Sequence, residues 1–78
     1  MFGIDKDVLD VIKRNFPVGS RVKLVRMEDI HAPEIGTLGT VVAVDDIGTI
    51  HVNWDNGSSL GVVCGEDICN VFAVNGVS

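Results

Sequence analysis

The chain of 78 residues contains no tyrosine, and its aromatic residues are three phenylalanines and one tryptophan. Binding sites of the aromatic-cage or polyproline-groove type need several exposed aromatic side chains close together, so this composition argues against both. Long apolar runs are also absent, because no segment approaches the ~18 residues that a membrane-spanning helix needs. The 46% of hydrophobic residues and the nine glycines are instead typical of a small folded domain with short strands and tight turns.

The two cysteines, Cys64 and Cys69, are too few for the disulfide framework of a small secreted domain. The first seven residues also lack the charged and then apolar layout of a secretory signal. We therefore expect a reducing, cytoplasmic location. A chain of this length leaves little room for a deep cleft, which counts against an enzyme.

No lysine or arginine follows Arg26. Six basic residues against three acidic ones give residues 1–26 a net charge of +3, whereas eight acidic residues and no basic one give residues 27–78 a net charge of −8. Such asymmetry concerns the choice of partner rather than the fold, and it permits weak head-to-tail self-association. The alternative is a solvated surface on which the charges happen to segregate.

Residues 5–15 are predicted to form a helix. Asp5 is a favourable N-cap, and Lys13 and Arg14 place positive charge in the last turn. Pro17 ends the helix, because its ring disfavours helical geometry at the residue before it. One apolar stripe follows from the spacing of Ile4, Val8, Leu9, Ile12 and Phe16. We expect this stripe to cover one open end or edge of the barrel that the rest of the chain forms.

The remainder of the chain reads as five short strands, predicted at residues 21–27, 39–44, 49–54, 59–63 and 68–72. Turn residues separate them at 45–48 and 55–58, a loop covers 28–38, and a short turn covers 64–67. This layout predicts an all-β fold, a five-stranded SH3-like small barrel with one N-terminal α-helix. The expected organisation is a helix at 1–17 packed on the barrel, the barrel at 18–73 and a frayed tail at 74–78.

Three motifs carry a resemblance to known families: an Ala-Pro loop at 32–33, Gly-Thr-Leu-Gly-Thr-Val at 36–41 and Trp-Asp-Asn-Gly-Ser at 54–58. The stretches 16–41 and 44–60, which contain these motifs, closely resemble a family of short bacterial and phage proteins described as a domain of unknown function. The Gly-Thr-Val and Trp-Asp-Asn-Gly skeleton is also similar to the substrate-recognition barrel of mind bomb-type ubiquitin ligases. It is more distantly similar to KOW-type barrels of ribosomal and transcription proteins. These last two resemblances imply binding rather than catalysis.

The candidate site for a protein partner joins the acidic loop to the turn after the third strand. Its residues are Glu28, Asp29, His31, Trp54, Asp55 and Asn56. The loop combines acidic residues with two isoleucines, so it could bind a partner with a basic surface. An ordinary solvated loop explains the same composition equally well. Trp54 fits two roles, an exposed anchor or, in phase with Ile50 and Val52, a plug in the core, and the core role is favoured. The Asp55–Asn56 turn is explained by structure alone.

The alternative function is that of a KOW-like module associated with nucleic acid. A basic patch of Lys13, Arg14, Arg21 and Lys23 would then contact phosphates. The acidic remainder of the chain and its lack of stacking aromatics argue against this alternative.

Metal and catalytic chemistry have weak signals. Cys64, Cys69, His31 and His51 lack zinc-site spacing, and Asp45–Asp46 lacks the alternating oxygen ligands of a calcium loop. No convergent nucleophile, base and third group can be identified. We therefore expect a cytoplasmic, non-catalytic module that binds a protein, with no metal, no cofactor and no membrane partner.

Overall fold

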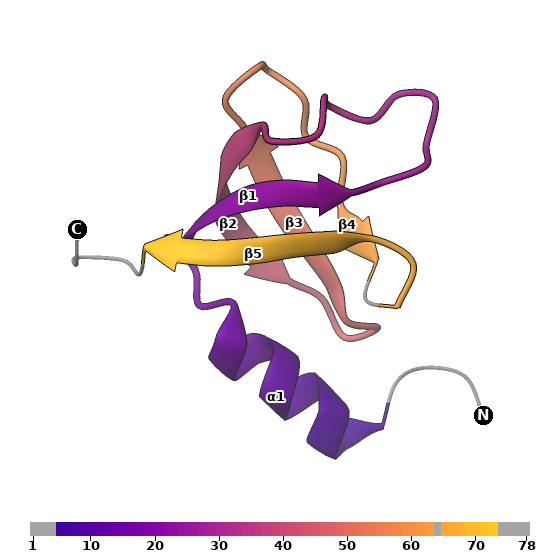
Figure 1. The fold of residues 1–78 in the computed structure, drawn as a ribbon. Helices are drawn as coiled ribbons and strands as arrows, with labels where there is room; N and C mark the ends of the chain where they lie inside the picture. The colour runs from indigo at the N-terminus through magenta and orange to yellow at the C-terminus, as the bar shows by residue number, and fades with distance from the viewer. Residues whose placement is uncertain (1–4, 64, 74–78) are drawn as a thin grey trace.

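In the computed structural model, residues 5–63 and 65–73 are described. One helix, α1 (Lys6–Asn15), precedes five strands: β1 (Arg21–Arg26), β2 (Leu38–Val44), β3 (Thr49–Trp54), β4 (Val62–Val63) and β5 (Ile68–Ala73). The strands form one antiparallel sheet in the order β4-β3-β2-β1-β5 (Figure 1). The predicted all-β class with a single N-terminal helix is therefore confirmed.

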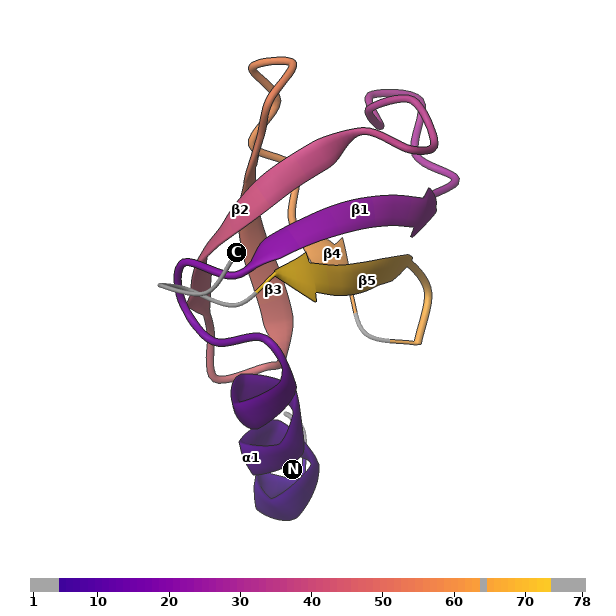
Figure 2. The ribbon, with the colours of Figure 1, turned by 60° about the vertical axis from the view of Figure 1, so that its left-hand side comes forward.

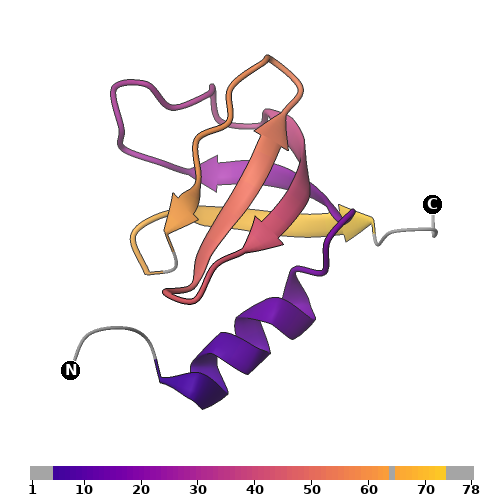
Figure 3. The same ribbon diagram turned by 180° about the vertical axis from the view of Figure 1, so that it is seen from behind.

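The sheet folds over on itself, because the β2–β3 pair crosses the β1–β5 pair at a steep angle (Figures 1 and 3). Gly39 lies in β2 opposite Trp54 of the neighbouring strand β3. A Cβ atom there would lie 2.5 Å from Cγ1 of Val52 and 2.8 Å from Cε3 of Trp54. Only glycine permits so close an approach without a shift of its neighbours.

The core lies between the two crossed pairs of strands. The alternation of the strands turns one face inward, and the side chains of Val22, Leu24, Val41, Ile50, Val52 and Val62 are fully buried there. Burial of each such side chain stabilises the fold by about 1.5–3 kcal/mol before conformational entropy is counted.

Helix α1 begins where the Asp5 carboxylate accepts a hydrogen bond from the Asp7 amide at 2.8 Å, as its sequence predicts. At the other end, the Phe16 amide donates to the Ile12 carbonyl at 2.9 Å. Ile12 is buried and Phe16 is half-buried against the core, but Val8 and Val11 are exposed. The helix lies at one end of the folded sheet and runs away from the strands toward its N-terminus (Figure 2).

Strand bounds differ from the prediction mainly at β4, which is two residues long rather than five. Leu60, which belongs to the predicted strand but not to β4, forms hydrogen bonds with side chains instead of with a neighbouring strand. Its carbonyl accepts from the Trp54 indole, and its amide donates to the Ser58 hydroxyl. These bonds at 2.9 and 3.3 Å remove two backbone groups that a longer strand would pair. The predicted positions of Ile4, Cys64 and the frayed tail 74–78 lie outside the described residues.

Five strands with a long connection after the first and a short turn before the last keep the layout predicted from the sequence. The SH3-like assignment of that layout stays a prediction. Within the part of the chain that is described, no helix has the length and apolar character needed to cross a membrane.

Candidate functional site

An acidic groove of about 630 Å³ lies between the end of β1, the outer side of β3 and the turn that leads into β5. We define the acidic groove by its lining residues: Met27, Glu28, Asp29, Thr49, His51, Ser59, Leu60, Gly61, Val63, Glu66 and Asp67. They come from segments far apart in the chain, and the folding of the sheet brings them together.

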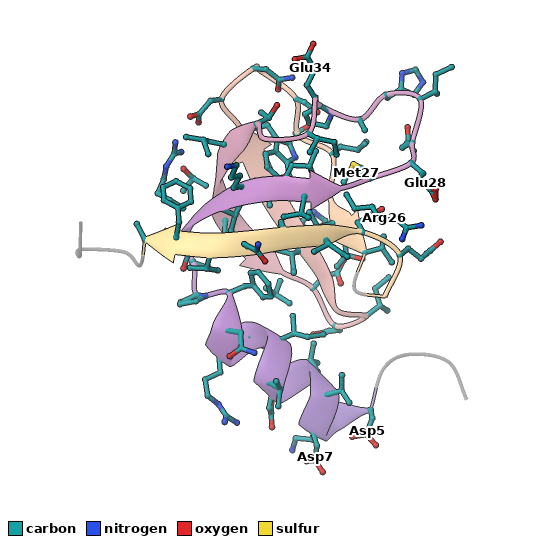
Figure 4. The ribbon with its side chains drawn as sticks, viewed as in Figure 1. Asp5, Asp7, Arg26, Met27, Glu28 and Glu34 are labelled. Atoms are coloured by element: carbon teal, nitrogen blue, oxygen red, sulfur yellow. The ribbon has the colours of Figure 1, made fainter. Side chains whose placement is uncertain are left out.

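Apolar and acidic side chains share this groove. Leu60 is half-buried and Val63 is exposed, so hydrocarbon surface is accessible from the groove, whereas Met27 is largely buried at its wall. Its carboxylates belong to Glu28, Asp29, Glu66 and Asp67. Figure 4 shows Met27 turned toward the sheet and Glu28 turned outward at the same end of β1.

Backbone amides fix two of these carboxylates. The Asp67 carboxylate accepts a hydrogen bond from the Val63 amide at 2.9 Å, across the turn between β4 and β5. The Asp29 carboxylate accepts one from the His31 amide at 2.7 Å, which closes a turn at the start of the long loop. The acidic groove is therefore built on anchored turns.

The negative charge of the acidic groove is little compensated. Among the described residues, the one ion pair made by a carboxylate of the groove joins Glu28 Oε1 to Arg26 Nη2 at 3.1 Å, and both side chains are well exposed. Exposed pairs of this kind contribute ~0–1 kcal/mol, and salt screens them. The carboxylates of the acidic groove that have no cationic partner in the described part of the chain would therefore attract a cationic ligand.

His51 lies at one wall of the acidic groove and pairs with Asp45, where the β2–β3 turn begins. Its Nε2 is 2.9 Å from Asp45 Oδ2, while Asp45 Oδ1 accepts from the amides of Thr49 and Ile47. The hydrogen bond to His51, followed by that from Thr49, holds the pKa of the Asp45 carboxyl below its usual value. Asp45 thus ties the turn together while it orients His51.

A second polar cluster joins Arg21 of β1 to Asp55 in the turn after β3. Arg21 donates to both carboxylate oxygens, at 3.0 and 2.6 Å, and also to Thr40 Oγ1 at 2.7 Å. This pairing raises the pKa of Arg21 and lowers the pKa of Asp55, mainly through the side-chain hydrogen bond. The Arg21 guanidinium also lies 6.0 Å from the centre of the Phe72 ring, and that ring is 53% exposed.

The prediction that Trp54 contacts a partner is wrong. Its side chain is 3% exposed within the core, and its indole N–H is already used by the Leu60 carbonyl. The favoured core role is the one found. Trp54 offers no exposed ring face to a partner.

The other residues predicted to bind a protein partner lie in different parts of the surface. Glu28 and Asp29 line the acidic groove, whereas His31, Asp55 and Asn56 do not. His31 is exposed in the long loop, and the Asn56 carboxamide oxygen accepts from the Ser58 amide at 3.0 Å within its own turn. The acidic loop and the Asp55 turn therefore do not form one continuous site.

Three titratable residues of the acidic groove were not part of the binding site predicted from the sequence: His51, Glu66 and Asp67. The alternation of β3 places His51 on the outer side, and Glu66–Asp67 is a visible acidic pair in a turn. Both patterns are visible in the sequence. The residues come together in one site only because β4 and the turn before β5 fold back beside β1.

The four basic residues predicted to contact phosphates differ in whether an acidic side chain already pairs with them. Lys13 and Arg14 are exposed in the last turn of α1, and Lys23 is exposed on β1. Arg21, in contrast, is held by Asp55. The exposed Phe72 ring also corrects the expectation that the chain offers no aromatic surface for stacking.

Among residues 5–63 and 65–73, no group of three or more metal-ligating side chains gathers in one place. Cys69 is buried in β5, and the remaining cysteine lies outside those ranges.

The family model described as domain of unknown function (DUF4314) matches residues 5–72, from the cap of α1 to the penultimate residue of β5. The chain belongs to this family. No curated protein and no solved structure matches the chain. Membership in DUF4314 assigns no activity, so the function has to be argued from the geometry of the surface.

Proposed function

We propose that this DUF4314 domain is a cytoplasmic, non-catalytic module with an SH3-like arrangement of strands, and that it binds a basic segment of a protein partner in the acidic groove. The observation that carries this proposal is the combination of exposed hydrocarbon with four carboxylates, of which one is paired within the described residues. The layout of five strands, one long loop and one short turn supports the SH3-like assignment.

A lysine- or arginine-containing segment fits both properties of the acidic groove. The methylene stems of lysine and arginine bury against apolar surface while their charged ends remain hydrated or paired. Here, the stems would lie over Met27, Leu60 and Val63, and the charged ends would reach Glu66 or Asp29. Complementary charge of this kind accelerates association and excludes acidic competitors.

The direct test is an amide-resolved NMR titration with a lysine-rich peptide that contains interspersed leucines. Its counterpart has glutamine in place of every lysine. We expect shifts at residues 27–29, 49–51 and 59–67 with the first peptide and none with the second.

Matched variants make this test specific. Asp29→Asn with Glu66→Gln should weaken binding ~10-fold, because two favourable charge contacts are lost, while the carboxamide oxygen introduced at position 29 can still accept from the His31 amide. Asp10→Asn with Glu34→Gln changes the net charge equally but lies outside the acidic groove, and it should leave binding unchanged. Equal effects of the two double variants would contradict the proposal.

Phe72 gives a second candidate function, binding of single-stranded nucleic acid on the outer face of β1 and β5. Base stacking on an exposed aromatic ring beside cationic side chains supports such binding. Lys23, which is paired in register with Asn70, would supply a phosphate contact on the same two strands. Because Asp55 neutralises Arg21, we rank this candidate second.

The same NMR experiment with an oligothymidylate separates the two functions. Shifts at residues 21–23 and 70–72 that persist at physiological salt, and that Phe72→Ser removes, would favour the nucleic-acid function. Shifts confined to the acidic groove with the basic peptide would favour the protein-binding function.

A further inference from the structure

Helix α1 presents an apolar face that the rest of the described chain does not cover. Val8 and Val11 are each 46% exposed, while Ile12, on the adjoining side of the helix, is buried against the core. The N-terminal half of α1 runs away from the sheet, and Figure 4 places Asp5 and Asp7 at its far end.

This arrangement leaves the helix short of stabilising contacts. A helix of ten residues is marginal in water without tertiary packing, even when its caps are good. Ile12 is the one buried residue within α1, so the sheet supports mainly the C-terminal half of the helix. A partner that packs on Val8 and Val11 would supply the missing contacts.

The charges beside this face are divided along the helix. Asp7 lies in the first turn, and Arg14, seven residues later on the same flank, lies in the last turn. When two such helices pack antiparallel about a two-fold axis, identical flanks meet in opposite directions. Asp7 of each copy then faces Arg14 of the other copy. In this register the two Val11 side chains meet near the two-fold axis, and each Val8 is offset by about 3 Å along the helix from Val11 of the other copy.

We propose that the exposed face of α1 is a self-association surface on which two copies of this chain pair their α1 helices antiparallel. The occupant is a second copy because the division of charge makes the face complementary to itself in this orientation. This surface is independent of the acidic groove, since none of the residues involved lines it.

The association is weak. A stable dimer buries ~1,200–2,000 Å² in total, and a single face of a ten-residue helix supplies less than that. We expect a dissociation constant in the high micromolar to millimolar range, which rises with added salt because two ion pairs contribute. Sedimentation equilibrium of the full chain over micromolar to millimolar concentrations measures it.

Charge reversal tests the orientation. Asp7→Arg alone and Arg14→Asp alone should each raise the dissociation constant ~10-fold, because two attractive pairs become repulsive. The double variant D7R/R14D should return to within about twofold of the original value, since the pairs are attractive again. An equimolar mixture of the two single variants should associate more tightly than either variant alone.

If these substitutions acted by destabilising α1, the dissociation constants of the three variants would follow the opposite order. The macrodipole favours an acid in the first turn and a base in the last, so the double variant would carry both unfavourable substitutions. If reversal acted through helix stability alone, D7R/R14D would therefore be the weakest of the three. That result would overturn the proposal.

Removal of the apolar contacts provides a second measurement. Val11→Ser should abolish association, whereas Val18→Ser changes a valine that is also exposed but lies outside α1, and it should have no effect. Dispersion of the amide signals of residues 21–73 in each variant verifies that the sheet is intact. A chain that is monomeric at millimolar concentration, with its Val8 and Val11 signals insensitive to concentration, would also overturn the proposal.

Discussion

Arg21 and Asp55 join the start of β1 to the turn after β3 through two parallel N–H···O hydrogen bonds at 3.0 and 2.6 Å. In the sequence they belonged to two competing interpretations, Arg21 to a phosphate-binding patch and Asp55 to a protein-binding turn. Their pairing removes both side chains from those sites. It instead connects two parts of the folded sheet that are 34 residues apart.

Removal of the Asp55 charge should make the stability of the domain less sensitive to acid. The folded-state pKa of Asp55 lies below its usual 3.8, so the pairing stabilises the fold fully above that pH and is lost as the pH falls through the lowered value. Asp55→Asn should therefore lower the urea midpoint slightly at neutral pH and have a smaller effect at pH 2, where more of the Asp55 carboxyl is protonated. Urea titrations at both pH values measure this, and Asp46→Asn is a suitable exposed control. An equal loss of stability at pH 2 would show that the charge is not responsible.

The Trp54 side chain should be the largest single contributor to stability that a mutation can reveal. Trp54→Ala removes a buried ring from a small core, and such changes cost about 3–5 kcal/mol. A domain of 78 residues has a free energy of unfolding of ~4–12 kcal/mol, so this variant is expected to be partly or wholly unfolded.

Trp54→Phe keeps most of the ring but leaves the Leu60 carbonyl without its donor, and it should cost ~1–3 kcal/mol. Urea unfolding followed by circular dichroism measures both changes. A loss below about 0.5 kcal/mol in Trp54→Phe would mean that the indole hydrogen bond is replaced by solvent.

Local patterns were sufficient for most of the secondary structure. The Asp5 cap and Pro17 predict the bounds of α1, and the alternation of Ile50, Val52 and Trp54 predicts both β3 and its buried face. Prediction of β4 was wrong in length because a tertiary hydrogen bond, from the Trp54 indole to the Leu60 carbonyl, replaces strand pairing. Strand propensity contains no information about such a bond.

The candidate site was predictable only in part. The acidic composition of the loop, which is a local property, predicts Glu28 and Asp29. Glu66 and Asp67 join them through the folding of the sheet, and that depends on contacts between residues nearly 40 positions apart. A single sequence without coupled substitutions gives no signal for such proximity.

A side chain at Gly39 should destabilise the fold where β2 pairs with β3. The Cβ of Gly39→Ala would overlap Val52 Cγ1 and Trp54 Cε3, both of which are buried and cannot move away freely. We expect a loss of about 1–3 kcal/mol, as for other overpacked cores. Val52→Ala is the matched background, because it removes the Cγ1 atom that lies 2.5 Å from the added Cβ, and Gly39→Ala should cost less there. An equal loss in both backgrounds would contradict the steric explanation.

The Asp45–His51 contact should be visible directly in the titration of the Asp45 carboxyl. Because the hydrogen bond to His51 is the largest cause of its lowered pKa, His51→Ala should shift the pKa of Asp45 upward, toward its usual 3.8. The shift should be incomplete, since the amides of Thr49 and Ile47 continue to donate to the same carboxylate. Carbon-detected NMR of the aspartate carboxyl groups measures this, and the pKa of Asp55 should not change. If the pKa of Asp45 stayed where it is, the two backbone amides alone would account for it, and His51 would be available to a ligand in the acidic groove without loss to the β2–β3 turn.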